Sequence, residues 1–338
     1  MKHILLFIVA LLILSFSTLG QNQNAKQLYA TAKEFIKQGD YDNATLVLNN
    51  ALKQEPYNLE MLEELAFVNY LKRDFAESIN VCKQIMDRPD VDEQVFQILG
   101  MNYKALAENK ECAKMYKAAL KKFPNSGVIY NEIGELMAAD KNLIGAIEQW
   151  EKGIELAPNY SNNYFNATNF YASTGNLFKE IIYGEIFINL ESYSTRTANV
   201  KALLLEAYKK IYTSNNMQQQ SLQYHSDFAN RFFETLAKSK NLADDGITPE
   251  VLTAIRARFI IDWFAENNQD KYPFRLFDHL QYLLREGMFE AYNEWIFATA
   301  ANPSNYATWI NTYPKQAEAF KQFQQSRVFK LPLGQYYK

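Results

Sequence analysis

The sequence has little glycine, proline or cysteine. Its 338 residues include 12 Gly, 9 Pro and 2 Cys, and glycine and proline both fall below their usual shares of about 7% and 5%. So few turn-forming residues argue against a collagen, a proline-rich linker and a turn-rich β-sandwich. Two cysteines cannot build a disulfide framework, and their separation does not match that of a structural zinc site.

The sequence also lacks a large excess of one charge. It carries 35 Lys and Arg against 38 Asp and Glu, for a formal net charge of −3. Since neither half is strongly basic, we expect no nucleic-acid binding. Hydrophobic residues make up 48% of the chain, which is too many for intrinsic disorder. The length corresponds to roughly two domains or to one elongated array.

The first twenty residues have the layout of a secretory signal peptide. A short basic start is followed by an apolar run from Ile4 to Phe16 and by small residues up to Gly20. The run is too short for a bilayer span, which takes roughly 20 residues. We therefore expect cleavage near Gly20 and export to a periplasm or out of the cell; the alternative is an uncleaved membrane anchor. No later stretch is long and apolar enough to span a membrane.

A period of 34 residues runs through the middle of the chain. The windows 25–58, 59–92, 93–126, 127–160 and 161–194 align without gaps. Each predicts two short amphipathic helices joined by a tight turn. Small residues recur on the first helix, where they let it approach its partner closely: Ala32, Ala66, Gly100 and Gly134. Prolines end three of the periods: Pro56, Pro124 and Pro158.

This pattern resembles the tetratricopeptide repeat family, in an exported bacterial form. The resemblance implies an all-α fold, an α-solenoid of helix-turn-helix repeats in which neighbouring units share a continuous core. It is strongest in the first, third and fourth periods and fades in the second half of the fifth. After a signal peptide at 1–20, we therefore expect five repeats over residues 21–194.

Residues 195–338 predict a divergent all-helical region. The segment 273–306 carries Leu276, Leu280 and Gly287 where a degenerate sixth repeat needs them; an unrelated helical hairpin is the alternative. The simplest architecture is one solenoid whose divergent C-terminal half caps the stack. A separate helical domain is the other possibility.

No enzyme signature occurs in the sequence. It contains no H-E-x-x-H, G-x-S-x-G, P-loop or G-x-G-x-x-G motif. His225 and His279 each share a helix face with apolar residues, so we expect packed histidines. Cys82 and Cys112 fall at packing positions, which favours buried thiols over a disulfide between neighbouring repeats. We predict no enzyme, cofactor or metal; an enzyme hidden in 195–338 is the remaining alternative.

The resemblance also implies a concave groove lined by the first helices. Some family members clamp a terminal carboxylate there with Lys, Asn and Arg, but Glu63 and Glu135 depart from that pattern. Aromatic, amide and acidic side chains favour an extended or helical protein segment, preferably a basic one. A solvated helix face is the alternative. The candidate contact residues are Tyr29, Lys33, Glu63, Phe67, Tyr70, Gln97, Met101, Asn131, Glu135, Phe165 and Asn169.

Together these features predict a non-catalytic protein–protein interaction scaffold of the bacterial cell envelope. Its partner is a protein or peptide, within an envelope complex. The alternative is an exported glycan-binding or glycan-processing accessory protein. Relatives of that kind usually carry a lipidated cysteine after the signal and long insertions, and this sequence has neither.

Overall fold

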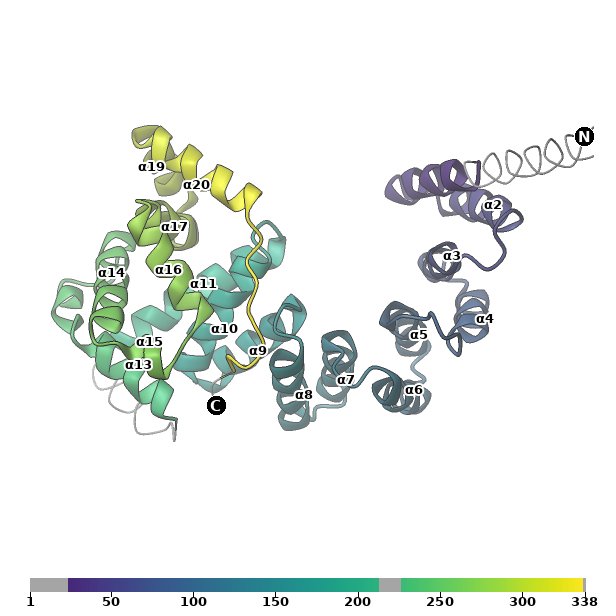
Figure 1. The fold of residues 1–338 in the computed structure, drawn as a ribbon, viewed down its shortest axis with the longest axis horizontal. Helices are drawn as coiled ribbons and strands as arrows, with labels where there is room; N and C mark the ends of the chain where they lie inside the picture. Colours follow the sequence, from purple (N-terminus) through teal and green to yellow (C-terminus); the bar gives the residue numbers. More distant parts are fainter. Residues whose placement is uncertain (1–23, 213–225, 337–338) are drawn as a thin grey trace, which may run out of the picture. The chain divides into compact units, whose positions relative to one another are not determined.

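The computed structural model describes residues 24–212 and 226–336. The chain forms two compact units, Met1–Pro124 (unit 1) and Asn125–Lys338 (unit 2), shown in Figure 1. Within the described ranges the regular structure is helical throughout, and none of those helices meets the length and hydrophobicity of a membrane span. The expected signal peptide and His225 lie outside the described residues.

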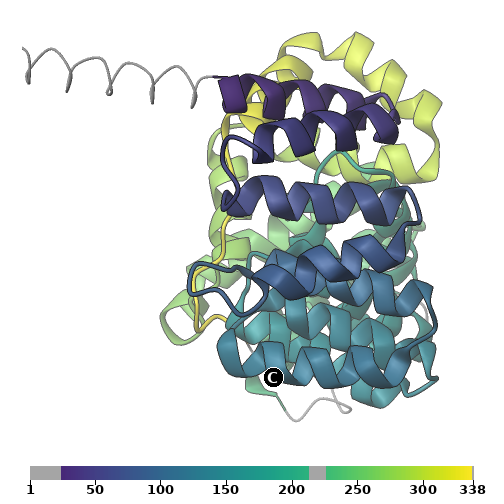
Figure 2. The same cartoon turned by 90° about the vertical axis from the view of Figure 1, so that its right-hand side faces the viewer.

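Unit 1 consists of successive helix pairs. A helix over residues 24–37 precedes α2 (Tyr41–Leu52), α3 (Leu59–Leu71), α4 (Phe75–Ile85), α5 (Glu93–Ala105) and α6 (Asn109–Lys122). Each helix packs against the next, so that the unit is a stack in sequence order (Figure 2). These helices match the predicted pairs of the first three repeats, which confirms the all-α solenoid.

One backbone feature recurs at the turn of all five repeats. A residue with positive φ stands one or two positions after each first helix: φ is 76° at Gly39, 64° at Arg73, 58° at Ala107, 64° at Lys141 and 82° at Gly175. Only glycine adopts this left-handed conformation without a steric cost. Three repeats therefore keep the turn geometry against the preference of their own side chain.

The residue after that turn caps the second helix. Asp40, Asp74, Asn142 and Asn176 each accept a hydrogen bond from a backbone N–H in the first turn of the helix that follows. Glu108 stands at the same position of the third repeat and makes no such bond. Because a side-chain cap contributes about 1 kcal/mol, the third repeat has the weakest second-helix start.

In the first four repeats, a small residue of the first helix is paired with a residue 16 positions later on the second. A Cβ added to Gly100 would lie 1.8 Å from the Tyr116 hydroxyl oxygen, and one added to Gly134 would lie 2.3 Å from the Trp150 ring nitrogen. In the first two repeats the small residue is alanine and its partner is smaller: Ala32 with Leu48, and Ala66 with Cys82. A larger side chain on the second helix thus goes with a smaller residue at the matching position of the first helix. In the fifth repeat the order is reversed: Gly184 on the second helix faces Thr168 on the first, and a Cβ added to Gly184 would lie 3.3 Å from the Thr168 methyl group.

Both cysteines are buried, and neither forms a disulfide. The Cys112 thiol lies 3.7 Å from the Gly100 carbonyl oxygen, as the Ser78 hydroxyl donates to the Ala66 carbonyl at 2.7 Å one repeat earlier. Cys112 and Ser78 therefore contact the backbone of the first helix in the same way. The expectation of buried thiols, rather than a disulfide, is confirmed.

Unit 2 begins with the fourth and fifth helix pairs. These are α7 (Gly127–Ala139), α8 (Leu143–Leu156), α9 (Ser161–Thr174) and α10 (Leu177–Leu190). The remaining elements are α11 (Thr195–Tyr212), α13 (Asp227–Ala237), η1 (Lys240–Ala243), α14 (Pro249–Ala265), α15 (Asn268–Lys271), α16 (Arg275–Arg285), α17 (Phe289–Asn293), the π-helix η2 (Glu294–Ala298), α18 (Thr299–Ala301), α19 (Pro303–Thr312) and α20 (Pro314–Ser326).

Helix α10 explains why the repeat pattern fades in the fifth period. Residues 177–188 of this helix are buried except for the half-buried Lys179, with α9 and α11 packed against it. A helix covered all round has no polar face and therefore loses amphipathic periodicity. The fourth and fifth repeats belong to the same compact unit as residues 195–336, so the units divide at 124/125, whereas the sequence pattern changes at 194/195.

The segment 273–306 forms a helical hairpin. Leu276, Leu280 and Leu283 are buried on α16, and Gly287 makes the turn with a φ of 69°. The second arm passes from α17 into the π-helix η2, which a regular repeat would not contain. A degenerate sixth repeat and an unrelated helical hairpin would both give this pair of helices. The π-helix is where the segment departs from a regular repeat.

Candidate functional site

In unit 1 the predicted groove residues lie on the first helices. The Tyr29 hydroxyl donates to Glu60 at 3.1 Å and to Glu64 at 3.2 Å. The Lys33 ammonium lies 3.6 Å from the Glu60 carboxylate and 4.4 Å from the centre of the Tyr29 ring. These contacts hold the helix 24–37 beside α3 and leave an exposed, mostly acidic surface.

Aromatic side chains continue this surface along α3. The rings of Phe67 and Tyr70 are stacked, with centroids 6.4 Å apart and planes 18° apart, and both are half-buried. On α5, Gln97 and Met101 are half-buried as well. We call this set the first-helix face of unit 1; it comprises Tyr29, Lys33, Glu60, Glu64, Phe67, Tyr70, Gln97 and Met101.

Glu63 differs from its neighbours because it is only 6% exposed. Burial, followed by the nearby charge of Asp92, raises the pKa of Glu63 to about 7. One of its carboxyl oxygens has no hydrogen-bond partner among the described residues. Glu63 therefore presents little surface to a partner and acts instead as a titratable group inside the repeat.

Unit 2 holds the other four predicted residues. Asn131 is fully buried; its amide donates to Glu135 at 2.9 Å, and its side-chain oxygen accepts from Asn166 at 2.9 Å. Phe165 is half-buried and packs against Phe187 at 5.3 Å, while Asn169 is exposed. The structure thus joins Asn131 and Glu135 in one network and leaves Asn169 outside it.

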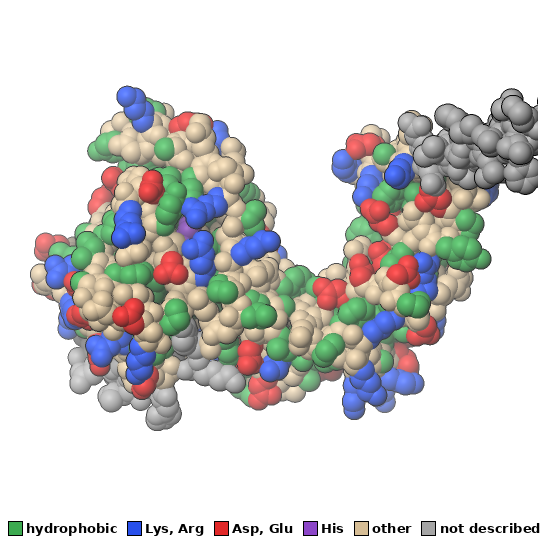
Figure 3. All heavy atoms as spheres, viewed as in Figure 1, with side chains coloured by type: hydrophobic (Ala, Val, Ile, Leu, Met, Phe, Trp, Pro, Cys, Tyr) green, Lys and Arg blue, Asp and Glu red, His purple; other side chains and the backbone are tan. Residues whose placement is uncertain are grey.

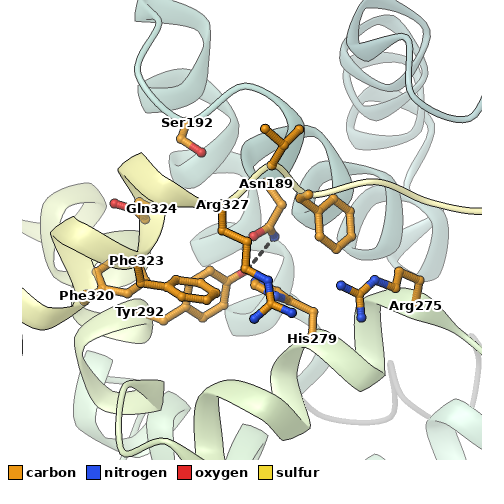
Figure 4. Close-up of a pocket in the computed structure, with 11 residues that line it drawn as sticks. Asn189, Ser192, Arg275, His279, Tyr292, Phe320, Phe323, Gln324 and Arg327 are labelled. Carbon is orange, nitrogen blue, oxygen red and sulfur yellow. Dashed lines mark hydrogen bonds between the residues drawn. The ribbon is translucent and has the colours of Figure 1, made fainter.

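A pocket that the sequence did not reveal lies on unit 2 (Figure 4). His279 is buried there, stacked on Phe323 at 5.9 Å and edge-on to Phe329 at 5.2 Å. Arg275 and Arg327 flank it, and basic side chains surround the histidine on this face in Figure 3. Burial, together with these two positive charges, lowers the pKa of His279 to about 3, so the ring is neutral at physiological pH. The cavity of about 30 Å³ has room for a single water.

A buried ion pair supports the floor of this pocket. Asn189 donates to the Tyr292 hydroxyl at 2.7 Å, and that hydroxyl donates to Glu185 at 3.0 Å. Glu185 in turn accepts from the guanidinium of Arg256, which is 2% exposed. The ion pair joins α10 to α14, and the Tyr292 hydroxyl adds α17 to the same network. No local pattern marks such a network, which explains why sequence reasoning missed it.

The C-terminal segment 327–336 runs along unit 2 without helix (Figure 1), and it turns at residues 333–334, where Gly334 has a φ of 83°. The Leu331 amide donates to the Asn159 side chain at 2.8 Å, and Asn159 donates back to the Leu331 carbonyl at 3.0 Å. Farther along, Gln335 accepts from the Arg275 backbone amide at 2.6 Å. The segment therefore closes both the His279 pocket and a second pocket, where Tyr336 lies beside Tyr164 and Tyr183.

The side chains that converge at these surfaces are aromatic, amide and charged groups. Within residues 24–212 and 226–336, no cluster of three or more His, Cys, Asp or Glu side chains could hold a metal ion.

Comparison with known proteins gives partial matches. No protein-family model matches the chain. A stretch of 138 residues, 40% of the chain, is 27% identical to tetratricopeptide repeat protein 21B of Homo sapiens and of Mus musculus, and it spans about 10% of the length of these curated relatives. A tetratricopeptide repeat protein of Thermus thermophilus aligns at TM-score 0.44 with 15% identity, covering 54% of this chain and 98% of that one. The pilF protein of Pseudomonas aeruginosa aligns at TM-score 0.45 with 14% identity, covering 64% and 98%.

Proposed function

We propose that this chain, whose 34-residue helix pairs and partial relatives support the tetratricopeptide repeat family, is a non-catalytic scaffold that holds other proteins in a bacterial cell envelope. The observation that carries the proposal is the first-helix face of unit 1. It combines half-buried aromatic rings with the exposed carboxylate of Glu60 and the half-buried carboxylate of Glu64, a mixture of apolar anchors and orienting charge that protein partners use.

The charge of this face defines the partner further. The carboxylates of Glu60 and Glu64 meet at the Tyr29 hydroxyl, and the Glu60 side chain is 69% exposed. Lys33 is the neighbouring cation. The acidic groups favour a partner segment that carries Lys or Arg beside an apolar residue, since opposite charges steer association. The three tryptophans that a glycan could use, Trp263, Trp295 and Trp309, are buried in unit 2.

Substitution of the aromatic pair tests the scaffold proposal. Phe67→Ala together with Tyr70→Ala removes the apolar anchors, and Tyr57→Ala is the matched control because Tyr57 is 83% exposed outside this face. After cross-linking in cells of the native organism, we expect the double variant to lose its captured partners and the control to keep them. Unchanged partners of a double variant with wild-type helicity would contradict the proposal.

The envelope location is tested separately. We expect the protein recovered from a periplasmic or secreted fraction to begin at Gln21, because cleavage near Gly20 removes the predicted signal peptide. N-terminal sequencing of the fractionated protein gives the answer, and an intact Met1 in the cytoplasmic fraction would overturn this part of the proposal.

A further inference from the structure

The C-terminal segment has the burial pattern of a bound extended peptide. Phe329 and Leu331 are 7% and 4% exposed, whereas Val328 and Leu333 are 76% and 69% exposed. In an extended chain, alternate side chains point to opposite faces. Phe329 and Leu331 therefore anchor one face of the segment to unit 2, while Val328, Lys330 and Pro332 on the other face are exposed. The alternation ends at Leu333, where the chain turns at residues 333–334.

The backbone of Leu331 is bound without regard to its side chain. One side-chain amide, that of Asn159, satisfies both the N–H and the C=O of Leu331, at 2.8 and 3.0 Å. A carboxamide can donate and accept at once, so it pairs with any extended residue. This is how a peptide-binding surface holds main chain while pockets select the side chains.

Two aromatic side chains of the segment pack against unit 2 and complete the walls of two pockets. Phe329 packs edge-on against His279 at 5.2 Å, beside Phe323 and Arg327. Tyr336 lines the second pocket together with Phe178 and Tyr183 of α10. Unit 2 therefore holds an aromatic residue, an aliphatic residue two positions later and a second aromatic residue five positions after that.

We propose that residues 327–336 are the resident ligand of unit 2, and that unit 2 binds a partner protein segment of the same chemistry by displacing them. The partner segment has the pattern aromatic-x-aliphatic-x₄-aromatic with no required charge; it is extended across the first two anchors and turns before the last aromatic residue, as the resident segment does at residues 333–334. The inference rests on the proposed function in taking the partner to be a protein segment. Its site lies on unit 2, apart from the first-helix face of unit 1.

Attachment to the chain makes the resident segment a strong competitor. A segment tethered by a short connection has an effective concentration on the order of 1 mM. If the free segment binds with a dissociation constant of about 10–100 μM, the tethered copy weakens an external peptide by roughly 10- to 100-fold. Weakening the resident anchors should therefore expose the site to a peptide added in solution.

The test uses the full chain and a fluorescent peptide with the sequence of residues 327–336. One variant carries Phe329→Ala and Leu331→Ala; its matched control carries Val328→Ala and Leu333→Ala, which shorten two exposed apolar side chains of the same segment. By fluorescence polarisation we expect the anchor variant to bind the peptide at least tenfold more tightly than the wild type and the control. Equal binding to all three, or no binding to a folded anchor variant, would overturn the proposal.

Two further measurements separate the possible failures. Adding Asn159→Ala to the anchor variant should weaken peptide binding at least tenfold, whereas adding Phe67→Ala and Tyr70→Ala should leave it unchanged, so that failure here is distinct from failure of the unit 1 site. If the anchor variant does not fold, hydrogen exchange of the wild type decides. We expect the Leu331 amide to exchange at least 100-fold faster than the amides of α10. Equal protection would make the segment a permanent part of the core and refute displacement.

Discussion

The pairing of Gly134 with Trp150 provides the sharpest test of how the repeats pack. In Gly134→Ala the new methyl group would lie 2.3 Å from the indole nitrogen and 2.6 Å from its neighbouring carbon, far inside van der Waals contact. The indole cannot move freely, because it is 6% exposed and its N–H donates to the Asn131 carbonyl at 3.3 Å. The substitution should therefore strain the fourth repeat.

The expected magnitude is a balance of two effects. Overpacking of a well-filled core costs about 1–3 kcal/mol, and replacing a mid-helix glycine by alanine returns about 1 kcal/mol of helix propensity. Because the methyl group would lie only 2.3 Å from the indole nitrogen, we take the upper part of that range, about 2–3 kcal/mol, and expect Gly134→Ala to lower the free energy of unfolding by about 1–2 kcal/mol. In a Trp150→Leu background the clash is gone, so the same substitution should be neutral or stabilising. The double variant has the Ala and Leu combination that the first repeat already has at Ala32 and Leu48.

A double-mutant cycle measures this coupling. Urea unfolding followed by circular dichroism at 222 nm on the wild type, the two single variants and the double variant should give a coupling energy of at least about 1 kcal/mol. Ala66→Gly in the second repeat is the control, since it changes helix propensity without relieving a clash. If Gly134→Ala costs the same in both backgrounds, or costs nothing in the wild type, the size-matching explanation is wrong.

Three further predictions concern single sites. Lys141→Gly should raise the free energy of unfolding by about 1 kcal/mol by removing the cost of a positive φ, and Gly175→Ala should lower it; thermal melts showing the same sign for both would contradict this. Glu108→Asp should add about 0.5–1 kcal/mol by supplying the missing cap, and unchanged stability in urea would refute it. Because the pKa of Glu63 is raised to about 7 when folded, its protonation stabilises the fold below pH 4.5 and this contribution is lost as pH rises through 7. The wild type should therefore lose more stability than Glu63→Gln between pH 5 and pH 8, by on the order of 1–3 kcal/mol, and parallel pH profiles of the two proteins would exclude the effect.

Buried ion pairs set a different kind of test for unit 2. Arg256→Met would leave the Glu185 carboxylate uncompensated in the core, which costs about 3–5 kcal/mol. Adding Glu185→Leu should recover most of that loss, since replacing both partners removes the unpaired charge. Equal unfolding midpoints for the single and double variants in urea would show that the pair does not hold α10 and α14 together.

The sequence by itself determined the repeat architecture of this protein. The 34-residue period predicted the helix pairs, because packing between neighbouring helices is local and needs the same small, large and capping residues in every unit. Ala32, Ala66, Gly100 and Gly134 mark that spacing directly. The candidate residues of the first-helix face could be located for the same reason, although how far each is buried could not: Glu63 and Asn131 occupy surface-like positions of the pattern and are buried in the structure.

Only the tertiary structure decided how the C-terminal half is held together. Two contacts join residues far apart in the chain: Arg256 and Glu185 are 71 residues apart, and Asn159 and Leu331 are 172 apart. No repeat period or sequence motif predicts either contact. The sequence of segment 327–336 predicts only an irregular tail, because the residues that it contacts lie on helices distant along the chain. Contacts of this kind depend on which surfaces the fold brings together, and the composition of a single segment carries no record of them.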